Sequence, residues 1–357
     1  MRIAVLGVGL IGGSIGLAAR ERAGAEVVGW GPRPKTLETA LQLGAIDRIA
    51  GSVEEAVVDA QAVFACAPVE LLGDLVTHAL NAAGPDCVVT DAGSTKRDLV
   101  EAITDERFIG GHPVAGAETA GVANARADLF EGAAWYLTPR PDSSGILFER
   151  LHRMLVSFGA RPSAIDAATH DRMLAAVSHL PHVLANVLVT QAASAVSDDE
   201  PLPRTGPSFR DMTRVAGANS DIWTGIYLTN RDAIAQQVDD VVERLREVSD
   251  ALRRADADAL RVWNDVARDD RRRMLEAGLE GGSVTELRLS VPNRPGIVAQ
   301  VALALGKAGV NIADMALAPA PDMRSGSMTL WVAGDGDAER ARRLIADLGF
   351  PAAVVEA

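Results

Sequence analysis

The chain has 357 residues, more than one hydrophobic core usually organises, so two or three domains are expected. Its composition is globular, with 48% apolar, 23% charged and 4% aromatic residues, which suits helices packed on a sheet of small side chains. The formal net charge of -13 disfavours binding to nucleic acids and to anionic membrane surfaces.

The chain begins with a strand pattern over Arg2–Leu6 and lacks the long apolar run of a signal peptide. Cys66 and Cys87 lie in apolar runs, which favours reduced core thiols over a disulfide or a ligand pair, and no metal site is expected. We therefore expect a cytoplasmic protein.

Short apolar runs alternate with helical patterns through about residue 165, which is typical of a parallel sheet with crossover helices. We predict a doubly wound α/β domain over residues 1–166. Its predicted strands are Arg2–Leu6, Glu26–Trp30, Ala62–Cys66, Cys87–Asp91, Phe108–Gly111, Trp135–Thr138 and Arg161–Ile165.

From Thr169 the apolar residues follow helical spacing, and no strand pattern returns for about a hundred residues. We predict an all-helical domain over residues 167–280. Met173–Ser197 contains no Asp, Glu, Lys or Arg and is long enough to cross a bilayer, but its polar residues favour a helix buried between the subunits of a homodimer. Ser197–Ser208 predicts a loop, and Val238–Leu275 is predicted to be charged and helical, with apolar positions on one face.

Gly278–Gly282 predicts a linker to a last domain over residues 283–357. The pattern there predicts a β-α-β-β-α-β, ferredoxin-like α+β fold, small enough to need a partner. Its predicted elements are strands over Val284–Val291 and Met328–Val332, helices over Ile297–Ala308 and Ala338–Leu348, and a short strand ending at Val355.

A glycine motif over Gly7–Gly12 follows the first strand and opens a helix. Gly7 permits a tight turn, Gly9 lets the backbone approach a pyrophosphate, and Gly12 lets helix and strand pack closely. The helix N-terminus then faces the anion, so the motif predicts a dinucleotide-binding Rossmann domain. The predicted cofactor-binding residues here are Gly7, Gly9, Leu10, Ile11 and Gly12.

The second strand of such a domain usually ends in an acid that binds the ribose of NAD. Gly31 stands at this place, and Arg33 and Lys35 follow it. These two cations are either ordinary surface residues or partners for the 2′-phosphate of NADP, so both cofactors stay open.

Two polar clusters follow predicted strands, where a doubly wound fold places ligands. Asp91–Lys96 turns from a strand into a helix, and Ser94 is either a site residue or only an N-cap. Gly111–Glu118 holds His112 directly before a proline at a strand end, which core packing does not explain well.

A third cluster, Val177–His182, lies on the predicted long helix. Ser178 and His182 share a face at i and i+4, whereas His179 points about 100° away, so His182 can accompany Ser178 into a site and His179 need not. Pro181 is expected to distort the helix here. The alternative is that His182 has only a structural role, at a contact between this helix and another.

Together with Phe209–Arg214 and Trp223, these motifs resemble the prephenate/arogenate dehydrogenase family of tyrosine biosynthesis. The resemblance covers residues 1 to about 280. Val291–Gly296 and Gly309–Ile312 resemble an ACT domain, a common amino-acid-sensing module. The resemblance implies an NAD(P)-dependent prephenate dehydrogenase that is a homodimer, with NAD favoured because this family mostly uses it.

By this resemblance, His112 takes the proton of the C4 hydroxyl of prephenate while C4 delivers hydride to the nicotinamide. Ser94 orients His112 and the nicotinamide. Arg214 holds the ring carboxylate through two hydrogen bonds, and Asp211 fixes it. The remaining implied substrate contacts are Ser178 and His182 at the pyruvyl side chain, Glu118 near the pocket mouth and Trp223 from the partner subunit.

The sequence departs from the family pattern at Ala117, where a hydroxyl residue is common, and at Gly31. In paired ACT domains the corresponding loops commonly enclose an amino acid, which makes tyrosine the natural effector. Asn293 and Asn311 would bind its amino or carboxylate group. The alternative is a purely structural dimerisation module.

Three other functions compete with this interpretation. Arogenate dehydrogenase carries out the same reaction on an amino side chain. β-Hydroxyacid dehydrogenases use a lysine on the interdomain helix, but Thr169–Val196 contains none. A non-catalytic sensor of nucleotides and amino acids would not need to retain His112, Ser178, His182 and Arg214 together.

Overall fold

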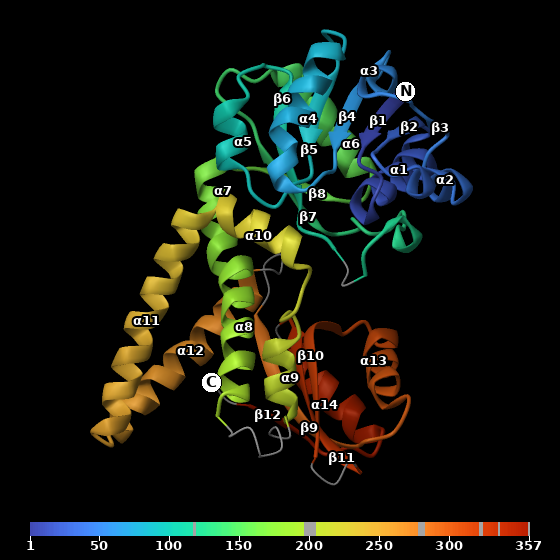
Figure 1. Ribbon diagram of the computed structural model, residues 1–357. Coiled ribbons are helices and arrows are strands. Elements are labelled where there is room, and N and C mark those ends of the chain that lie inside the picture. Colours follow the sequence, from blue (N-terminus) through green and yellow to red (C-terminus); the bar gives the residue numbers. More distant parts are fainter. Residues whose placement is uncertain (117–118, 196–204, 278–282, 321–323, 335, 356–357) are drawn as a thin grey trace. The chain divides into compact units, whose positions relative to one another are not determined.

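The computed structural model describes residues 1–116, 119–195, 205–277, 283–320, 324–334 and 336–355. The chain divides into two units, each described by itself (Figure 1). The first comprises Met1–Val187 and Val215–Asp240, and the second comprises Leu188–Arg214 and Val241–Ala357. The predicted linker Gly278–Gly282 and most of the predicted loop Ser197–Ser208 lie outside the described residues.

Within the described residues, the first unit contains an eight-stranded sheet ordered β3-β2-β1-β4-β5-β6-β7-β8. The order reverses between β1 and β4, and doubly wound sheets bind ligands beyond the strand ends at such a switch point. All seven predicted strands are present, and β3 was not predicted. The strands are β1 (Arg2–Leu6), β2 (Glu26–Trp30), β3 (Arg48–Ile49), β4 (Ala62–Ala65), β5 (Val88–Asp91), β6 (Phe108–Pro113), β7 (Ala134–Thr138) and β8 (Arg161–Ala164).

The prediction of a wholly parallel sheet is wrong at one edge. β6 and β7 pair antiparallel, with His112 opposite Tyr136, whereas the other neighbours in this sheet pair parallel. In its described part, the connection between these strands contains only the short 3-10 helix η1 (Val122–Asn124). A parallel return needs a longer crossover, usually a helix, so this chain returns in the opposite direction.

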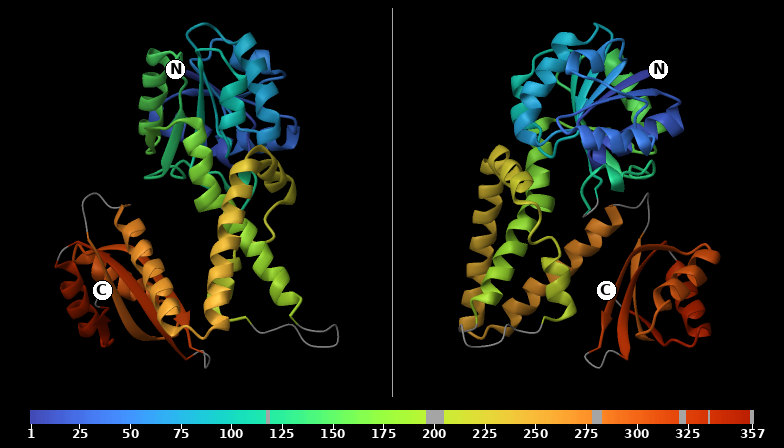
Figure 2. Two further views of the ribbon diagram at one scale, coloured as in Figure 1. Left: turned by 90° about the vertical axis from the view of Figure 1, so that its left-hand side faces the viewer. Right: turned by 45° about the vertical axis from the view of Figure 1, so that its right-hand side comes forward.

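Helices cover both faces of this sheet (Figure 2). The alternation of β1 shows why: Ile3 and Val5 pack with one set of helices, while Ala4 and Leu6 pack with the other. The first set is α1 (Leu10–Ala23), α2 (Pro34–Gln42) and α6 (Gly145–Ser157), and the second is α3 (Val53–Val57), α4 (Val69–Ala82) and α5 (Arg97–Ala102).

A long helical stretch follows β8, made of α7 (Ala167–Leu174), the π-helical turn η2 (Ala175–His179) and α8 (Leu180–Ala193). It begins at Asp166, whose side chain accepts a hydrogen bond from the Thr169 N–H at 2.9 Å. The distortion expected at Pro181 is present as this π-helical turn. Pro181 offers no N–H to the carbonyl of Val177, and the wider turn lies directly before it.

The stretch Ala167–Ala193 is long and apolar enough to cross a membrane, by length and composition. However, it carries His170, Asp171 and His179, which are buried and hydrogen-bonded inside the first unit. Hydrocarbon would penalise such groups heavily. These buried polar groups argue against a membrane-spanning role for the stretch.

The rest of the first unit is helical, with α10 (Ser220–Thr229) and the beginning of α11 (Arg231–Arg253). The predicted helical region Val238–Leu275 consists of two helices, α11 and α12 (Ala257–Ala277). The break lies at Ala255, whose φ of 51° is left-handed and ends the α-helical path.

The second unit contains α9 (Pro207–Thr213), α12 and a four-stranded antiparallel sheet ordered β10-β11-β9-β12. Its element order is the predicted β-α-β-β-α-β pattern. Leu287, Leu289 and Val291, at alternate positions of β9, pack under α13 and α14. The elements are β9 (Val284–Pro292), α13 (Ile297–Lys307), β10 (Asn311–Pro319), β11 (Ser325–Ala333), α14 (Asp337–Asp347) and β12 (Ala352–Val354).

Candidate active site

The glycine motif forms the turn between β1 and α1, as predicted. Gly7 has a φ of 98°, and a Cβ there would collide with the carbonyl oxygen of Cys66. A Cβ at Gly12 would collide with the carbonyl oxygen of Gly7. At Gly9, by contrast, a Cβ would meet nothing within 4 Å. Two glycines are therefore required by the fold itself, whereas Gly9 borders open space.

The N-terminus of α1, at Leu10 and Ile11, has no side-chain cap. Its backbone N–H groups and the positive end of the helix dipole therefore remain available to an anion. Beside the open space at Gly9, this arrangement fits the pyrophosphate of a dinucleotide. The residues present thus fit the cofactor that the motif predicts.

The end of β2 carries no carboxylate at the ribose position. Gly31 is half-buried, and the two cations after it, Arg33 and Lys35, are exposed. In the described ranges neither side chain has a hydrogen bond or an ion pair. Both are therefore available to a ligand at this end of the sheet.

His112 lies near the end of β6 and is 9% exposed. The end of the neighbouring strand β5 is held close to β6, because the Gly111 N–H donates to Asp91 Oδ1 at 3.0 Å. Asp91 also accepts the Gly93 N–H at 2.8 Å and forms a fully buried ion pair with Lys96. The predicted cluster Asp91–Lys96 and the predicted histidine therefore form one buried polar region.

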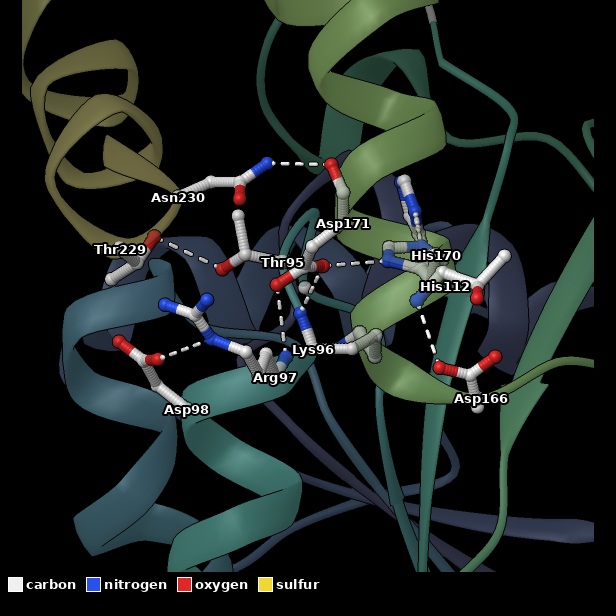
Figure 3. Close-up of polar contacts among 12 residues, drawn as sticks. Thr95, Lys96, Arg97, Asp98, His112, Asp166, His170, Asp171, Thr229 and Asn230 are labelled. Atoms are coloured by element: carbon white, nitrogen blue, oxygen red, sulfur yellow. Dashed lines mark hydrogen bonds and ion pairs between the residues drawn. The ribbon is translucent and has the colours of Figure 1, made fainter. Parts of the chain in front are cut away.

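A chain of side chains continues from His112 to residues that the sequence analysis did not single out (Figure 3). His112 Nδ1 lies 2.9 Å from His170 Nε2, and His170 Nδ1 lies 2.7 Å from Asp171 Oδ1. His170 is fully buried and stands edge-on to Tyr136, with 5.6 Å between ring centroids. The available signal was a His-Asp pair at the start of a predicted helix, which looks like ordinary capping.

Asp171 joins three parts of the first unit. Its Oδ1 accepts the Lys96 N–H at 2.8 Å and its Oδ2 accepts the Arg97 N–H at 2.9 Å, so it caps α5. Its own carbonyl accepts a hydrogen bond from Asn230 Nδ2 at 2.8 Å. Burial raises the pKa of this carboxyl, but the hydrogen bonds from His170, Arg97 and Lys96 outweigh burial and lower it below 3.8.

The pKa of His112 lies well below 6.5, first because burial disfavours the imidazolium and then because His170, Lys96 and His179 surround it. Burial likewise lowers the pKa of His179 to about 4. Both rings are therefore neutral near pH 7, and a neutral imidazole can accept a proton.

A second group of rings lies on the long helix and α10. His182 stacks on Trp223, with ring centroids 3.4 Å apart, and His179 meets the same indole edge-on at 6.1 Å. His179 and His182 are three residues apart, so they lie on neighbouring parts of the helix surface and both reach this indole. The expectation that His179 lies apart from the group around His182 is therefore wrong. Ser178 is half-buried, and Trp223 contacts His182 within one chain.

The other predicted residues fall in different places. Ser94 is half-buried and makes no side-chain hydrogen bond in the described ranges. Asp211 and Arg214 are exposed in the second unit, on α9 and at its C-terminal end. Glu118, with the departure at Ala117, lies outside the described residues.

The two predicted regulatory asparagines also belong to the second unit. The N–H of Asn293, just after β9, donates to the carbonyl of Arg324 at 2.9 Å, and Asn311 begins β10. Gly296 and Gly309, in the two loops that carry the ACT resemblance, have φ values of 85° and 75°. Both loops therefore use glycine in the left-handed region.

Two family models match the chain one after the other. The nucleotide-binding domain of prephenate dehydrogenase matches residues 15–163, and the prephenate dehydrogenase dimerization domain matches residues 166–264. A prephenate dehydrogenase of Bacillus subtilis (strain 168) is 30% identical over 358 residues, which cover 96% of this chain and 95% of that protein. That likeness extends beyond the two family models.

Solved structures agree with this assignment. Prephenate dehydrogenase from Aquifex aeolicus, in complex with hydroxyphenyl propionate and NAD+, is 26% identical with a TM-score of 0.73, covering 77% of this chain and 98% of that one. Synechocystis arogenate dehydrogenase is 26% identical with a TM-score of 0.68, covering 77% and 100%. The chain belongs to the prephenate dehydrogenase family.

Proposed function

We propose that the protein is an NAD(P)-dependent prephenate dehydrogenase, which converts prephenate into 4-hydroxyphenylpyruvate and CO2. Membership of the family supports this proposal, as does the Bacillus subtilis relative. The observation that carries it is the neutral, buried His112 beside the strand ends where this fold binds ligands.

The chemistry asks for one base and accurate positioning. When bound, the nicotinamide accepts hydride from C4 of the substrate. His112 takes the proton of the C4 hydroxyl, so the oxygen becomes a carbonyl as the hydride leaves. The bond to the ring carboxylate then breaks, CO2 departs, and the electron pair makes the ring aromatic. The proton returns to the oxygen, which gives the phenol.

We assign the substrate contacts to the residues that the family resemblance implies. Arg214 holds the ring carboxylate with support from Asp211, and Ser178 with His182 meets the pyruvyl side chain. Trp223 closes over His182, on which it stacks in this chain. Ser94 orients His112 and the nicotinamide, and Glu118 belongs to the pocket mouth.

We propose NAD as the cofactor, with NADP as the alternative. The open side of Gly9 and the uncapped N-terminus of α1 fit the pyrophosphate that both share. Exposed Arg33 and Lys35 favour NADP, whereas the NAD+ complex of the Aquifex aeolicus relative favours NAD. The double variant Arg33→Ala/Lys35→Ala separates them, because it raises the KM of NADP+ without changing that of NAD+.

We further propose that residues 283–357 form an ACT domain, that the protein is a homodimer and that it is cytoplasmic. The four-stranded sheet with two helices on one face supports the ACT assignment. The match to a dimerization domain supports the dimer. Tyrosine is the proposed effector at Asn293 and Asn311, and a purely structural module is the alternative.

A comparison of prephenate with arogenate, each with NAD+ and NADP+, tests the proposed function. We expect reduced nicotinamide to form with prephenate. Turnover of arogenate alone would assign the activity of the Synechocystis relative instead. Binding of nucleotide without turnover of either substrate would favour the non-catalytic sensor.

A further inference from the structure

We propose that His170 and Asp171 are positioning residues that hold His112 with its proton on Nδ1, so that Nε2 is the atom that accepts the substrate proton. This inference rests on the proposed function, in which His112 is the base. It adds the atom that reacts and the two residues that select it.

The order of donors and acceptors follows from Asp171. Its carboxylate accepts two backbone N–H groups, from Lys96 and Arg97, and these groups can only donate. The same Oδ1 faces His170 Nδ1 at 2.7 Å, so that nitrogen carries a proton. In a neutral His170 the other nitrogen, Nε2, then has a lone pair and accepts from His112 Nδ1 at 2.9 Å.

This leaves His112 Nε2 without a proton. A histidine whose Nδ1–H is held by a buried acceptor has one fixed tautomer and one fixed ring orientation, which is the arrangement a general base needs. After His112 takes a proton, its imidazolium still donates from Nδ1 to His170. The carboxylate of Asp171 then lies one ring away and stabilises the positive charge.

The surroundings keep this chain of side chains in place. His170 is fully buried, and its ring is edge-on both to Tyr136 and to His112. Asn230 holds the backbone carbonyl of Asp171. The other charged or titratable groups near the two imidazoles are Tyr136, His179 and the buried Lys96–Asp91 pair, of which His179 and Lys96 lower the pKa of His112.

The alternative is that His170 only fills space beneath the site. A space-filling residue would tolerate a side chain of similar size, and its replacement would change stability more than turnover. A positioning residue is instead sensitive to whether an acceptor atom faces His112 Nδ1. Two substitutions at position 170 distinguish these roles.

His170→Leu removes the acceptor, and His170→Gln places an amide oxygen close to the position of Nε2. In the full-length protein with prephenate and NAD+, we expect H170L to lower kcat by about 100-fold while KM changes little. H170Q should recover about tenfold or more of that loss. His78→Leu, at an exposed histidine on α4, is the matched control and should keep wild-type kcat.

Nitrogen NMR of the wild-type protein labelled at its six histidines reads the tautomer directly and requires no turnover. The resonances of His112 are identified by their loss in His112→Asn. We expect a protonated Nδ1 in the wild type and a shift of the proton to Nε2 in H170L, because a buried N–H without an acceptor is costly.

A proton on Nε2 of His112 in the wild type overturns the inference. So does an H170L variant with near wild-type kcat, or an H170Q variant no better than H170L. Loss of the proposed function is a separate result, namely a wild-type protein that turns over neither prephenate nor arogenate. The tautomer measurement on wild-type protein decides the inference even where a variant fails to fold.

Discussion

His112 is nearly buried, and both its burial and the groups around it favour the neutral imidazole. Burial supplies the low pKa, and His170 supplies a partner for one ring nitrogen. The remaining nitrogen is free for chemistry. At the scale of single residues, the proposed base is therefore a histidine prepared by its surroundings rather than an exposed one.

The most direct test of that base is His112→Asn. An amide keeps part of the polar character but cannot accept a proton near neutral pH, so we expect turnover to fall by about 100-fold or more. The affinity for prephenate should change little. Steady-state kinetics with substrate binding by calorimetry checks both, and near wild-type turnover would remove His112 from its role.

The pH dependence of turnover follows from the same pKa. Because the pKa of His112 lies well below 6.5, the base is already unprotonated at pH 6.5 and above. We expect kcat/KM for prephenate to stay level on the acid side down to about pH 6.5 and to fall only below it. A half-maximal value near pH 7 would show that another group controls the reaction.

At the scale of elements, the turn between β1 and α1 uses its glycines for different reasons. Gly7 and Gly12 leave no room for a Cβ, whereas Gly9 has open space beside it. The first two are needed for the strand and helix to pack, and the third is kept clear for a ligand. One motif therefore serves both folding and binding.

Paired substitutions separate these roles. Gly9→Val should leave the thermal unfolding temperature nearly unchanged but weaken NAD+ binding strongly, because the side chain fills the space for the pyrophosphate. Gly12→Val should lower stability by several kcal/mol, on the order of 3, because it collides with the Gly7 carbonyl. Calorimetric unfolding and titration with NAD+ measure the two effects. Equal losses of stability in both variants would contradict the distinction.

The helical stretch after β8 shows a similar division of roles. Its beginning carries His170 and Asp171 to the strand ends, and its later part places His179 and His182 against one indole. Residues three apart on a helix are surface neighbours, so both histidines can reach one side chain of α10.

At the scale of the whole molecule, buried neutral histidines link folding to pH. His112 and His179 have folded-state pKa values below 6.5, the value expected in the unfolded chain, so the unfolded state binds protons first as the pH falls. The stabilisation is complete above about pH 6.5. For His179 it is lost progressively as the pH falls toward about 4.

We therefore expect the free energy of unfolding to decrease from about pH 6.5 to 4, with a slope of up to ~1.4 kcal/mol per pH unit for each such histidine. His179→Gln should make this slope shallower, because the protein then takes up about one proton fewer on unfolding. Denaturant unfolding at several pH values measures it. A free energy of unfolding that stays constant over this range would contradict the burial of both rings.

The C-terminal domain allows a test of regulation in the intact protein. If tyrosine binds at the two loops after β9 and before β10, Asn293→Ala and Asn311→Ala should abolish inhibition by tyrosine and leave basal turnover unchanged. Asn81→Ala, at an exposed position on α4, is the control. Inhibition that persists in both variants would place the effector elsewhere or favour the structural module.

The sequence alone predicted most of the strands, the cofactor motif and His112 as the candidate base, because each depends on local spacing: alternation in strands, a glycine turn before a helix, a histidine before a proline. Only the tertiary structure decided that β7 runs antiparallel to β6, that the long helix widens before Pro181, and that His170 and Asp171 stand behind His112. His170 is 58 residues from His112 in sequence, and no local pattern specifies which ring nitrogen faces which acceptor. That choice arises from packing between distant segments. Burial there removes water, so a polar atom without a hydrogen-bond partner costs free energy.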